Sequence, residues 1–310
     1  MKESSVVSRQ SSVMERPSVF ERHAPLISII VATLDRHTDL ERLLASADAQ
    51  RCDRYEVLVI DQGEASAETV ASRHRHVRFF RSSTKGLSHS RNIGILHAVG
   101  DLLTFADDDC VLSVDYVGTL SDYAPRLSEP LVFGFANALH LEDDLPVVTT
   151  FRPGGTVGPW RCDTLCSISL VFNRLTFDRV GGFDETFGLG APFPAGEETD
   201  LLLRLMAAGG HGVYLERLTI RHPSRARTSD LVRRYESYGF AHGALARKHA
   251  RNRTFLARFG YGLTRTLGGL TLGLVRRNGL APLYRASLRG KLRGFHLFSQ
   301  PPAPTGPTSS

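Results

Sequence analysis

The C-terminal quarter of the chain contains no acidic residue. Positions 237–310 hold 12 Lys and Arg residues and neither Asp nor Glu, whereas positions 1–236 hold 26 Lys and Arg residues against 32 acids. The net charge of +6 therefore divides into −6 for the first part and +12 for the tail. Positive charge that is spread over a whole fold is typical of proteins that bind nucleic acid. Here the excess positive charge is confined to the C-terminal segment, so we expect no nucleic-acid partner.

The sequence also has few features of secretion or membrane insertion. Residues 1–24 are polar and lack the apolar segment of a signal peptide, so we expect a disordered lead-in and a cytoplasmic protein. The longest apolar run of the tail, Leu267–Val275, is far shorter than the ~20 residues that a spanning helix needs. The four cysteines fit neither a zinc knuckle nor a disulfide framework, and we expect free thiols.

The first third of the chain alternates buried strands with amphipathic helices. Leu26–Ala32 is a continuous apolar run, typical of a parallel strand that is buried on both faces. Further strands are expected at Tyr55–Ile60 and Val77–Arg81, each preceded by a helical segment. This order predicts a Rossmann-like α/β fold with a doubly wound, mostly parallel sheet. No G-x-G-x-x-G follows the first strand, so the dinucleotide-binding fingerprint is missing.

Three consecutive acids follow the next predicted strand, Leu102–Ala106. Alternate residues of an extended chain point the same way, so the side chains of Asp107 and Asp109 are expected to converge, with Asp108 between them. Ligands of open α/β sheets bind at the carboxyl ends of the strands. Two carboxylates there suit a hard divalent cation such as Mg or Mn, shared with a substrate phosphate. The alternative is a solvated acidic turn.

Two further segments carry candidate functional groups. Ser88 or Ser90 is expected to cap a helix that places Arg91 at the sheet edge, either as part of an anion site or as an ordinary surface arginine. The acidic segment 197–200 begins a helix after a Gly- and Pro-rich loop. Its acids either interact favourably with the helix dipole or bring a carboxylate over a cleft. His222, at a strand end, is by itself more often structural than a metal ligand.

Six short segments occur in an order and spacing that we recognise. They are Ser28–Thr33, Glu56–Asp61, Gly86–Asn92, Phe105–Asp109, Gly181–Glu185 and Gly196–Asp200. Over roughly residues 26–224 the sequence thereby resembles the family 2 glycosyltransferases, which are inverting enzymes with the A-type nucleotide-sugar-binding fold. Each segment is a weak signal by itself, and the ordered set is a strong one.

The resemblance implies roles for individual positions. It implies that the nucleotide-sugar donor is held by Thr33, Asp35, Asp61, Arg91, Asp107 and Asp108. It implies a divalent metal, Mg or Mn, bound by Asp107 and Asp109, with His222 where some members place a third ligand. Glu198 stands where the family usually has the catalytic aspartate of a Glu-Asp pair, and neighbouring Asp200 is the alternative base.

The chemistry of these groups agrees with that assignment. A sugar diphosphate breaks at its anomeric carbon when the charge that builds on the leaving phosphate is neutralised, which a divalent ion and Arg91 can do. One positioned carboxylate suffices as general base for a single inverting displacement. The sequence therefore predicts an inverting glycosyltransferase that uses a UDP- or dTDP-sugar. Its hydroxyl acceptor would be a glycan, a lipid-linked sugar or a small molecule.

Two other classes of function were weighed. A nucleotidyltransferase on a related fold usually carries a Gly-rich, basic signature after the first strand, which Ala32–Arg36 lacks. A non-catalytic membrane-binding module would not be expected to keep acids at all three candidate sites.

The chain divides by composition into four parts. We expect a lead-in over 1–24, a catalytic domain over 25–227, a basic helical extension over 228–300 and a disordered tail over 301–310. Arginines alternate with short apolar runs through the extension. This pattern indicates one of two arrangements. The helices lie on an anionic membrane surface, as a peripheral contact with the inner face of the membrane, or they pack on the acidic core of the protein.

Overall fold

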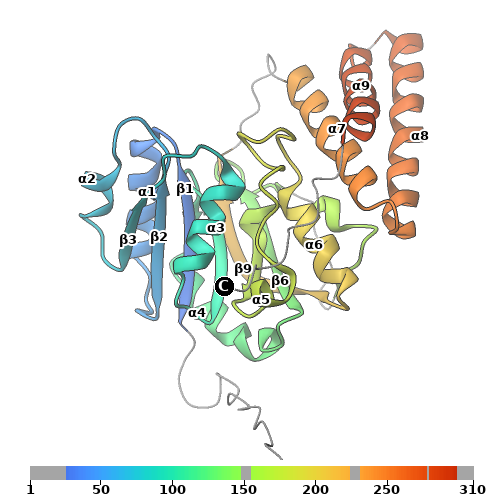
Figure 1. The fold of residues 1–310 in the computed structure, drawn as a ribbon. Helices are drawn as coiled ribbons and strands as arrows, with labels where there is room; N and C mark the ends of the chain where they lie inside the picture. The colour runs from blue at the N-terminus through green and yellow to red at the C-terminus, as the bar shows by residue number, and fades with distance from the viewer. Residues whose placement is uncertain (1–25, 148–154, 224–230, 278, 299–310) are drawn as a thin grey trace, which may run out of the picture.

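The computed structural model describes residues 26–147, 155–223, 231–277 and 279–298. The expected lead-in over 1–24 and tail over 301–310 lie outside these ranges. The described chain forms a central nine-stranded sheet with helices on both faces. Three C-terminal helices form a further group beside it (Figure 1).

The elements alternate along the chain as the sequence predicts. The strands are β1 Ile27–Thr33, β2 Tyr55–Asp61, β3 Val77–Arg81, β4 Leu102–Asp107, β5 Val111–Leu112, β6 Val132–His140, β7 Thr156–Val157, β8 Leu170–Asn173 and β9 His211–His222. The α-helices are α1 His37–Asp48, α2 Glu68–Ala71, α3 Leu87–His97, α4 Tyr116–Tyr123, α5 Thr176–Val180, α6 Glu197–Ala207, α7 Leu231–Lys248, α8 Arg253–Arg276 and α9 Ala281–Leu297. Short 3-10 helices are η1 Ala124–Leu127, η2 Cys162–Thr164 and η3 Ser167–Ser169.

The sheet has the order β3-β2-β1-β4-β8-β6-β9-β5, and β7 pairs with β9. Strands β1 to β4, β6 and β9 run in one direction, and β5, β7 and β8 run in the other. This is the mostly parallel α/β sheet that the sequence predicts. Because β1, β2 and β4 are parallel, their carboxyl ends meet at one edge, with Thr33 opposite Asp61 and Ala32 opposite Asp107.

Each face of the sheet is covered by its own hydrophobic core. Ile29 and Val31 of β1 share the core of one face with the leucines of α1, whereas Ile30 lies against Gly94 of α3 in the core of the other face. All of these side chains are buried. This burial on both faces explains why β1 is a continuous apolar run rather than an alternating one.

The helix that carries Arg91 begins differently from our expectation. It starts at Leu87, and Gly86 precedes it without any side-chain cap. Ser88 and Ser90 are buried within the first turn, and the Ser88 hydroxyl donates to the carbonyl of Phe187 at 2.6 Å. The expectation that one of these serines caps the helix was therefore wrong, because Gly86 holds the N-cap position and the Ser88 hydroxyl bonds outside the helix.

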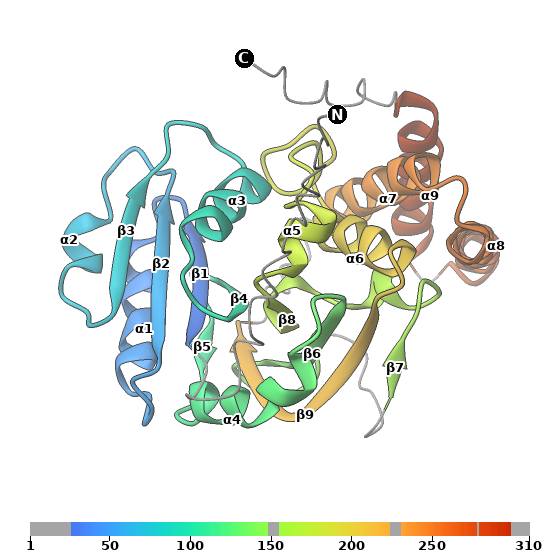
Figure 2. The same cartoon turned by 60° about the horizontal axis from the view of Figure 1, so that its bottom comes forward.

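The C-terminal extension consists of three helices, of which α7 lies nearest the sheet and α8 lies outermost (Figures 1 and 2). Ala241 and Leu245 of α7 share a core with the leucines of α6. Helix α9 packs closely on α7, because glycines of both helices face the partner backbone at Gly239, Gly243, Gly290 and Gly294. Among the described residues, no helix combines the length and hydropathy that would let it cross a membrane.

The close contact of α7 and α9 gives a first prediction. A Cβ on Gly294 would collide with the carbonyl oxygen of Phe240, so Gly294→Ala should lower the free energy of unfolding by about 1–3 kcal/mol, the usual cost of overpacking. The matched control is Gly268→Ala in α8, where a Cβ meets no atom within 4 Å. It should raise stability by about 0.5–1 kcal/mol through helix propensity. Denaturant unfolding of both variants measures the difference, and equal values would contradict the close packing.

Candidate active site

Two acids and a histidine meet at the carboxyl edge of the sheet. Asp107 ends β4, Asp109 lies in the turn that follows it, and His222 ends β9. Their ligand atoms lie within 4.8 Å of one another. The Nε2 of His222 is 3.2 Å from an oxygen of Asp109 and 3.7 Å from an oxygen of Asp107. Two carboxylates and an imidazole are a donor set that suits Mn or Mg, so these residues fit the expected metal.

The middle acid of the triplet has a different environment. Asp108 accepts a hydrogen bond from the Thr33 hydroxyl at 2.9 Å and from Arg36 at 2.6 Å. Burial raises the pKa of Asp108 to about 6, although the charge of Arg36 opposes the shift. Arg36 also binds Asp109 at 2.9 Å. Our sequence reasoning missed Arg36, although its place in the loop after β1, at the edge that carries the acids, was a usable signal.

The two other acids of the predicted donor site hold the loop after β2. Asp61 is fully buried, and it accepts hydrogen bonds from two backbone amides of residues 63–67 at 2.8 Å and from Arg81 at 2.5 Å. Asp35 is exposed and accepts from two further amides of this loop, at 2.8 and 3.2 Å. Both side chains therefore lie at the edge where the resemblance places the nucleotide.

Arg91 is buried and connects the two halves of the site. Its guanidinium donates to Glu197 at 2.8 Å, to the Ser167 hydroxyl at 2.7 Å and to Asp107 at 3.3 Å. The same group lies 5.5 and 5.8 Å from the centroids of two phenylalanine rings. Asp107, Asp109 and His222 form the candidate metal-binding site, called the metal cluster below. Arg91 contacts this site directly, through the carboxylate of Asp107. Sequence reasoning did not foresee the pairing with Glu197.

Glu198 stands at the start of α6, directly after Glu197. It is partly exposed and lines a cavity between α6 and α7. Burial of the carboxyl group raises its pKa well above the usual range, and the neighbouring charge of Glu197 adds to the shift. The group is therefore a stronger base than an ordinary glutamate once it is ionised.

Asp200 has a different environment from Glu198. It is fully buried and binds Arg204 and His249 at 2.8 Å and Lys248 at 2.5 Å. Burial by itself would raise the pKa of Asp200, but the hydrogen bond from His249 and the charges of Arg204 and Lys248 lower it well below its usual range. This carboxylate joins α6 to α7.

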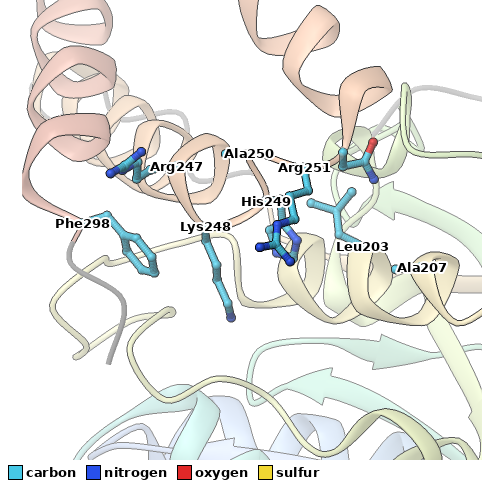
Figure 3. Close-up of a pocket in the computed structure, with 9 residues that line it drawn as sticks. Leu203, Ala207, Arg247, Lys248, His249, Ala250, Arg251 and Phe298 are labelled. Atoms are coloured by element: carbon cyan, nitrogen blue, oxygen red, sulfur yellow. The ribbon is translucent and has the colours of Figure 1, made fainter. Parts of the chain in front are cut away.

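A cavity of about 800 Å³ opens beside that contact. Figure 3 shows its lining at the C-terminal end of α7, next to Leu203 and Ala207 of α6. Arg247, Lys248, His249 and Arg251 make the lining basic. Two of these side chains, Lys248 and His249, already bind Asp200.

Comparison with known proteins agrees with this geometry. Residues 28–135 match the family model described as "Glycosyl transferase family 2". Within these residues the chain matches a family 2 glycosyltransferase domain. The pre-mycofactocin glycosyltransferase of Mycobacterium tuberculosis is 26% identical over 245 residues, which cover 72% of this chain and 48% of that protein. The chain thus spans about half the length of this curated relative.

Solved structures show the A-type glycosyltransferase fold. Residues 1–349 of S. aureus TarS in complex with UDP align with a TM-score of 0.55 at 13% identity, covering 87% of this chain and 89% of that one. The mannosyltransferase PcManGT from Pyrobaculum calidifontis, in complex with GDP-Man and Mn2+, aligns with a TM-score of 0.57 at 15% identity, covering 88% and 87%. The family 2 match contains the acidic triplet but ends before Glu198, Asp200 and His222.

The metal cluster gives a second prediction. Asp109→Asn keeps the shape of the side chain but removes one charged ligand, so Mn2+ should bind at least about tenfold more weakly, the scale of losses at altered metal sites. Asp115→Asn is the control, because Asp115 is exposed and pairs with Arg51 away from the cluster. Titration of Mn2+ by electron paramagnetic resonance, with and without UDP, measures the change. Equal affinity in Asp109→Asn and the unaltered protein would contradict the assignment.

Proposed function

We propose that this protein is an inverting glycosyltransferase that moves a sugar from a nucleoside-diphosphate donor to a hydroxyl acceptor in one displacement. The observation that carries the proposal is the arrangement around Arg91. This side chain contacts Asp107 of the metal cluster and also Glu197, the residue next to Glu198. A site for a diphosphate and a site for a general base therefore lie side by side on a family 2 domain.

The donor half of the proposal rests on the carboxyl edge of the sheet. Asp107, Asp109 and His222 would hold Mn or Mg, which neutralises charge on a leaving diphosphate when it is bound. Arg91 holds Asp107 in place, and Arg36 holds Asp108 and Asp109. These contacts fix the carboxylates before a donor arrives, which limits reorganisation during the reaction.

A uridine or thymidine nucleotide is the favoured donor. Asp35 and Asp61 hold the loop after β2 in place at the edge that would receive the base. One protein of the same fold was solved with UDP and another with GDP-Man, so both kinds of nucleotide are compatible with the fold. The family resemblance, which puts the pyrimidine ring N–H against Asp61, favours UDP or dTDP.

Glu198 is the proposed general base. It lines the cavity between α6 and α7, and burial of its carboxyl group, together with the charge of Glu197, raises its pKa, which makes the ionised group a stronger base. In the reaction it would take the proton of the attacking acceptor hydroxyl. Asp200, which we considered as the alternative, is fully buried and binds Arg204, Lys248 and His249, so we propose that it instead positions α7 against α6.

The third prediction separates these two carboxylates. Glu198→Gln should reduce kcat by about 10²–10⁴ and leave the affinity for UDP with Mn2+ unchanged, because only proton transfer is lost. The acid limb of the kcat profile should lie above the ordinary glutamate pKa of about 4.3, since the rate falls as Glu198 becomes protonated. That limb should disappear in Glu198→Gln.

Asp200→Asn is the companion variant. It removes the charge of a fully buried carboxylate that pairs with Arg204 and Lys248, so it should lower the free energy of unfolding by about 3–5 kcal/mol. If Asp200→Asn kept its stability and lost turnover while Glu198→Gln stayed active, the base would be Asp200.

The outer helix α8 is the proposed membrane contact. Its exposed apolar side chains are Leu267, Leu272, Leu274 and Val275, and Val275 is 75% exposed. Arg265, Arg276 and Arg277 are exposed near them. Apolar groups flanked by cations suit the surface of an anionic membrane, where each basic residue adds about 1 kcal/mol. We propose that α8 holds the enzyme at such a surface, on the cytoplasmic side.

Flotation with vesicles gives the fourth prediction. The protein should bind phosphatidylserine vesicles at low salt and release as salt rises. The double variant Leu272→Glu with Val275→Glu should lose most of this binding. Leu96→Glu on α3, where the leucine is 78% exposed but remote from α8, is the control. Equal flotation of all three proteins would mean that α8 is not the anchor.

A further inference from the structure

Glu198 shares its cavity with side chains from the C-terminal extension. The cavity measures about 260 Å³ and lies between the start of α6, η2 and α7. Its lining residues are Asp163, Ala195, Gly196, Glu198, Thr199, Tyr238, Ala241, His242 and Leu245. This volume is slightly below the range of about 300–1,000 Å³ that is usual for drug-sized ligands, so the cavity suits a compact group.

Two polar side chains lie next to each other in the lining of this cavity. The Nε2 of His242 is buried and has no hydrogen-bond partner among the described residues; it lies 3.7 Å from an oxygen of Asp163. Burial, together with the charges of Lys291 and Arg258, lowers the pKa of His242 to about 3, so the imidazole is neutral. Asp163 is held by two contacts of 3.0 and 3.3 Å from Arg258 of α8. A neutral imidazole and a fixed carboxylate can each bind a hydroxyl group.

Aromatic side chains lie at the outer side of the cavity. Tyr238 lines it and is 57% exposed. Trp160, three residues before Asp163, is 43% exposed, and its ring lies 5.9 Å from that of Tyr261 on α8. Tyr261 lies one helical turn after Arg258, which binds Asp163, so the aromatic pair belongs to the two chain segments that carry this ion pair. Large aromatic surfaces are usually buried, and two that are exposed together indicate a binding surface.

We infer that this cavity is the acceptor site and that the acceptor is a neutral carbohydrate. One sugar ring would occupy the cavity with its reacting hydroxyl toward Glu198 and other hydroxyls on Asp163 and His242. The next sugar unit would lie on the Trp160–Tyr261 pair. The inference rests on the proposed function, since Glu198 defines which hydroxyl reacts.

The charges of the cavity favour a neutral sugar over the other acceptor classes. Asp163 and Glu198 both line it, so a phosphate or carboxylate group on the acceptor would meet two acids. Arg258 is already engaged by Asp163. An acyl chain would leave the polar atoms of the cavity without partners, which costs free energy. Sugar rings instead combine hydroxyl donors with an apolar face that can cover an aromatic ring.

The fluorescence of Trp160 reports on this surface directly, because the chain contains a single tryptophan. The protein would be titrated with maltose, cellobiose, lactose and N,N′-diacetylchitobiose, and with glucose 6-phosphate as an anionic comparison. We expect a saturable change with at least one of the disaccharides and none with the phosphate. The absence of a saturable change with all four disaccharides, or tighter binding of the phosphate, would overturn the inference.

Variants connect the signal to the cavity. Tyr238→Ala and His242→Ala should each weaken the best disaccharide roughly tenfold, the scale of one hydrogen bond or aromatic contact. Tyr235→Ala is the matched control, because Tyr235 is 41% exposed on the same helix and does not line the cavity. Tyr238 is a surface residue, so its variant stays informative even if His242→Ala unfolds. Unchanged affinity in Tyr238→Ala would overturn the inference.

A parallel titration with UDP and Mn2+ separates this inference from the proposed function. If UDP binds in a Mn2+-dependent way and no disaccharide binds, the carbohydrate assignment is wrong and the proposed function stands. If a disaccharide binds but UDP with Mn2+ does not, the proposed transfer reaction fails and the acceptor role fails with it.

Discussion

The buried guanidinium of Arg91 is the interaction on which the site depends. A cation can be buried only if carboxylates and other acceptors surround it, and Arg91 takes them from three separate parts of the chain: Asp107 of β4, Ser167 of η3 and Glu197 of α6. Loss of one partner of such a buried pair typically costs about 3–5 kcal/mol. The pairing therefore fixes the start of α6, and with it Glu198, relative to the metal cluster.

A second set of ionic contacts makes the basic extension part of the catalytic fold. Lys248 of α7 and the following residue, His249, bind Asp200, and Arg258 of α8 binds Asp163. Helix α7 packs on the core and α9 packs on α7, which agrees with the interpretation of helices packed on the rest of the fold. Helix α8 buries Phe255 and Phe259 in that core and keeps an outer surface of apolar and basic side chains, on which the proposed membrane contact rests. Charge pattern alone could not separate these helices, because it does not say which side faces the core.

What the sequence predicts well is local or follows from strand direction. The convergence of Asp107 and Asp109 could be predicted because the two residues stand two positions apart at the carboxyl end of one strand. The partners of Arg91 could not, because Glu197 lies 106 residues away and only the packing of α6 brings it near. The failed cap at Ser88 has the same cause, since the serine hydroxyl bonds to a carbonyl 99 residues away.

The difference between local pattern and long-range packing also separates the proposed donor site from the proposed acceptor site. Most residues of the proposed donor edge stand at strand ends within residues 28–135, where the family model matches, whereas His222 lies beyond that match. The cavity beside Glu198 is closed by Tyr238 and His242 of α7, a helix outside that match. Its shape depends on how α7 is held against α6, through Asp200. A change in the extension would therefore alter which acceptor fits while leaving the donor edge intact, and acceptor choice cannot be read from the motifs that identify the domain.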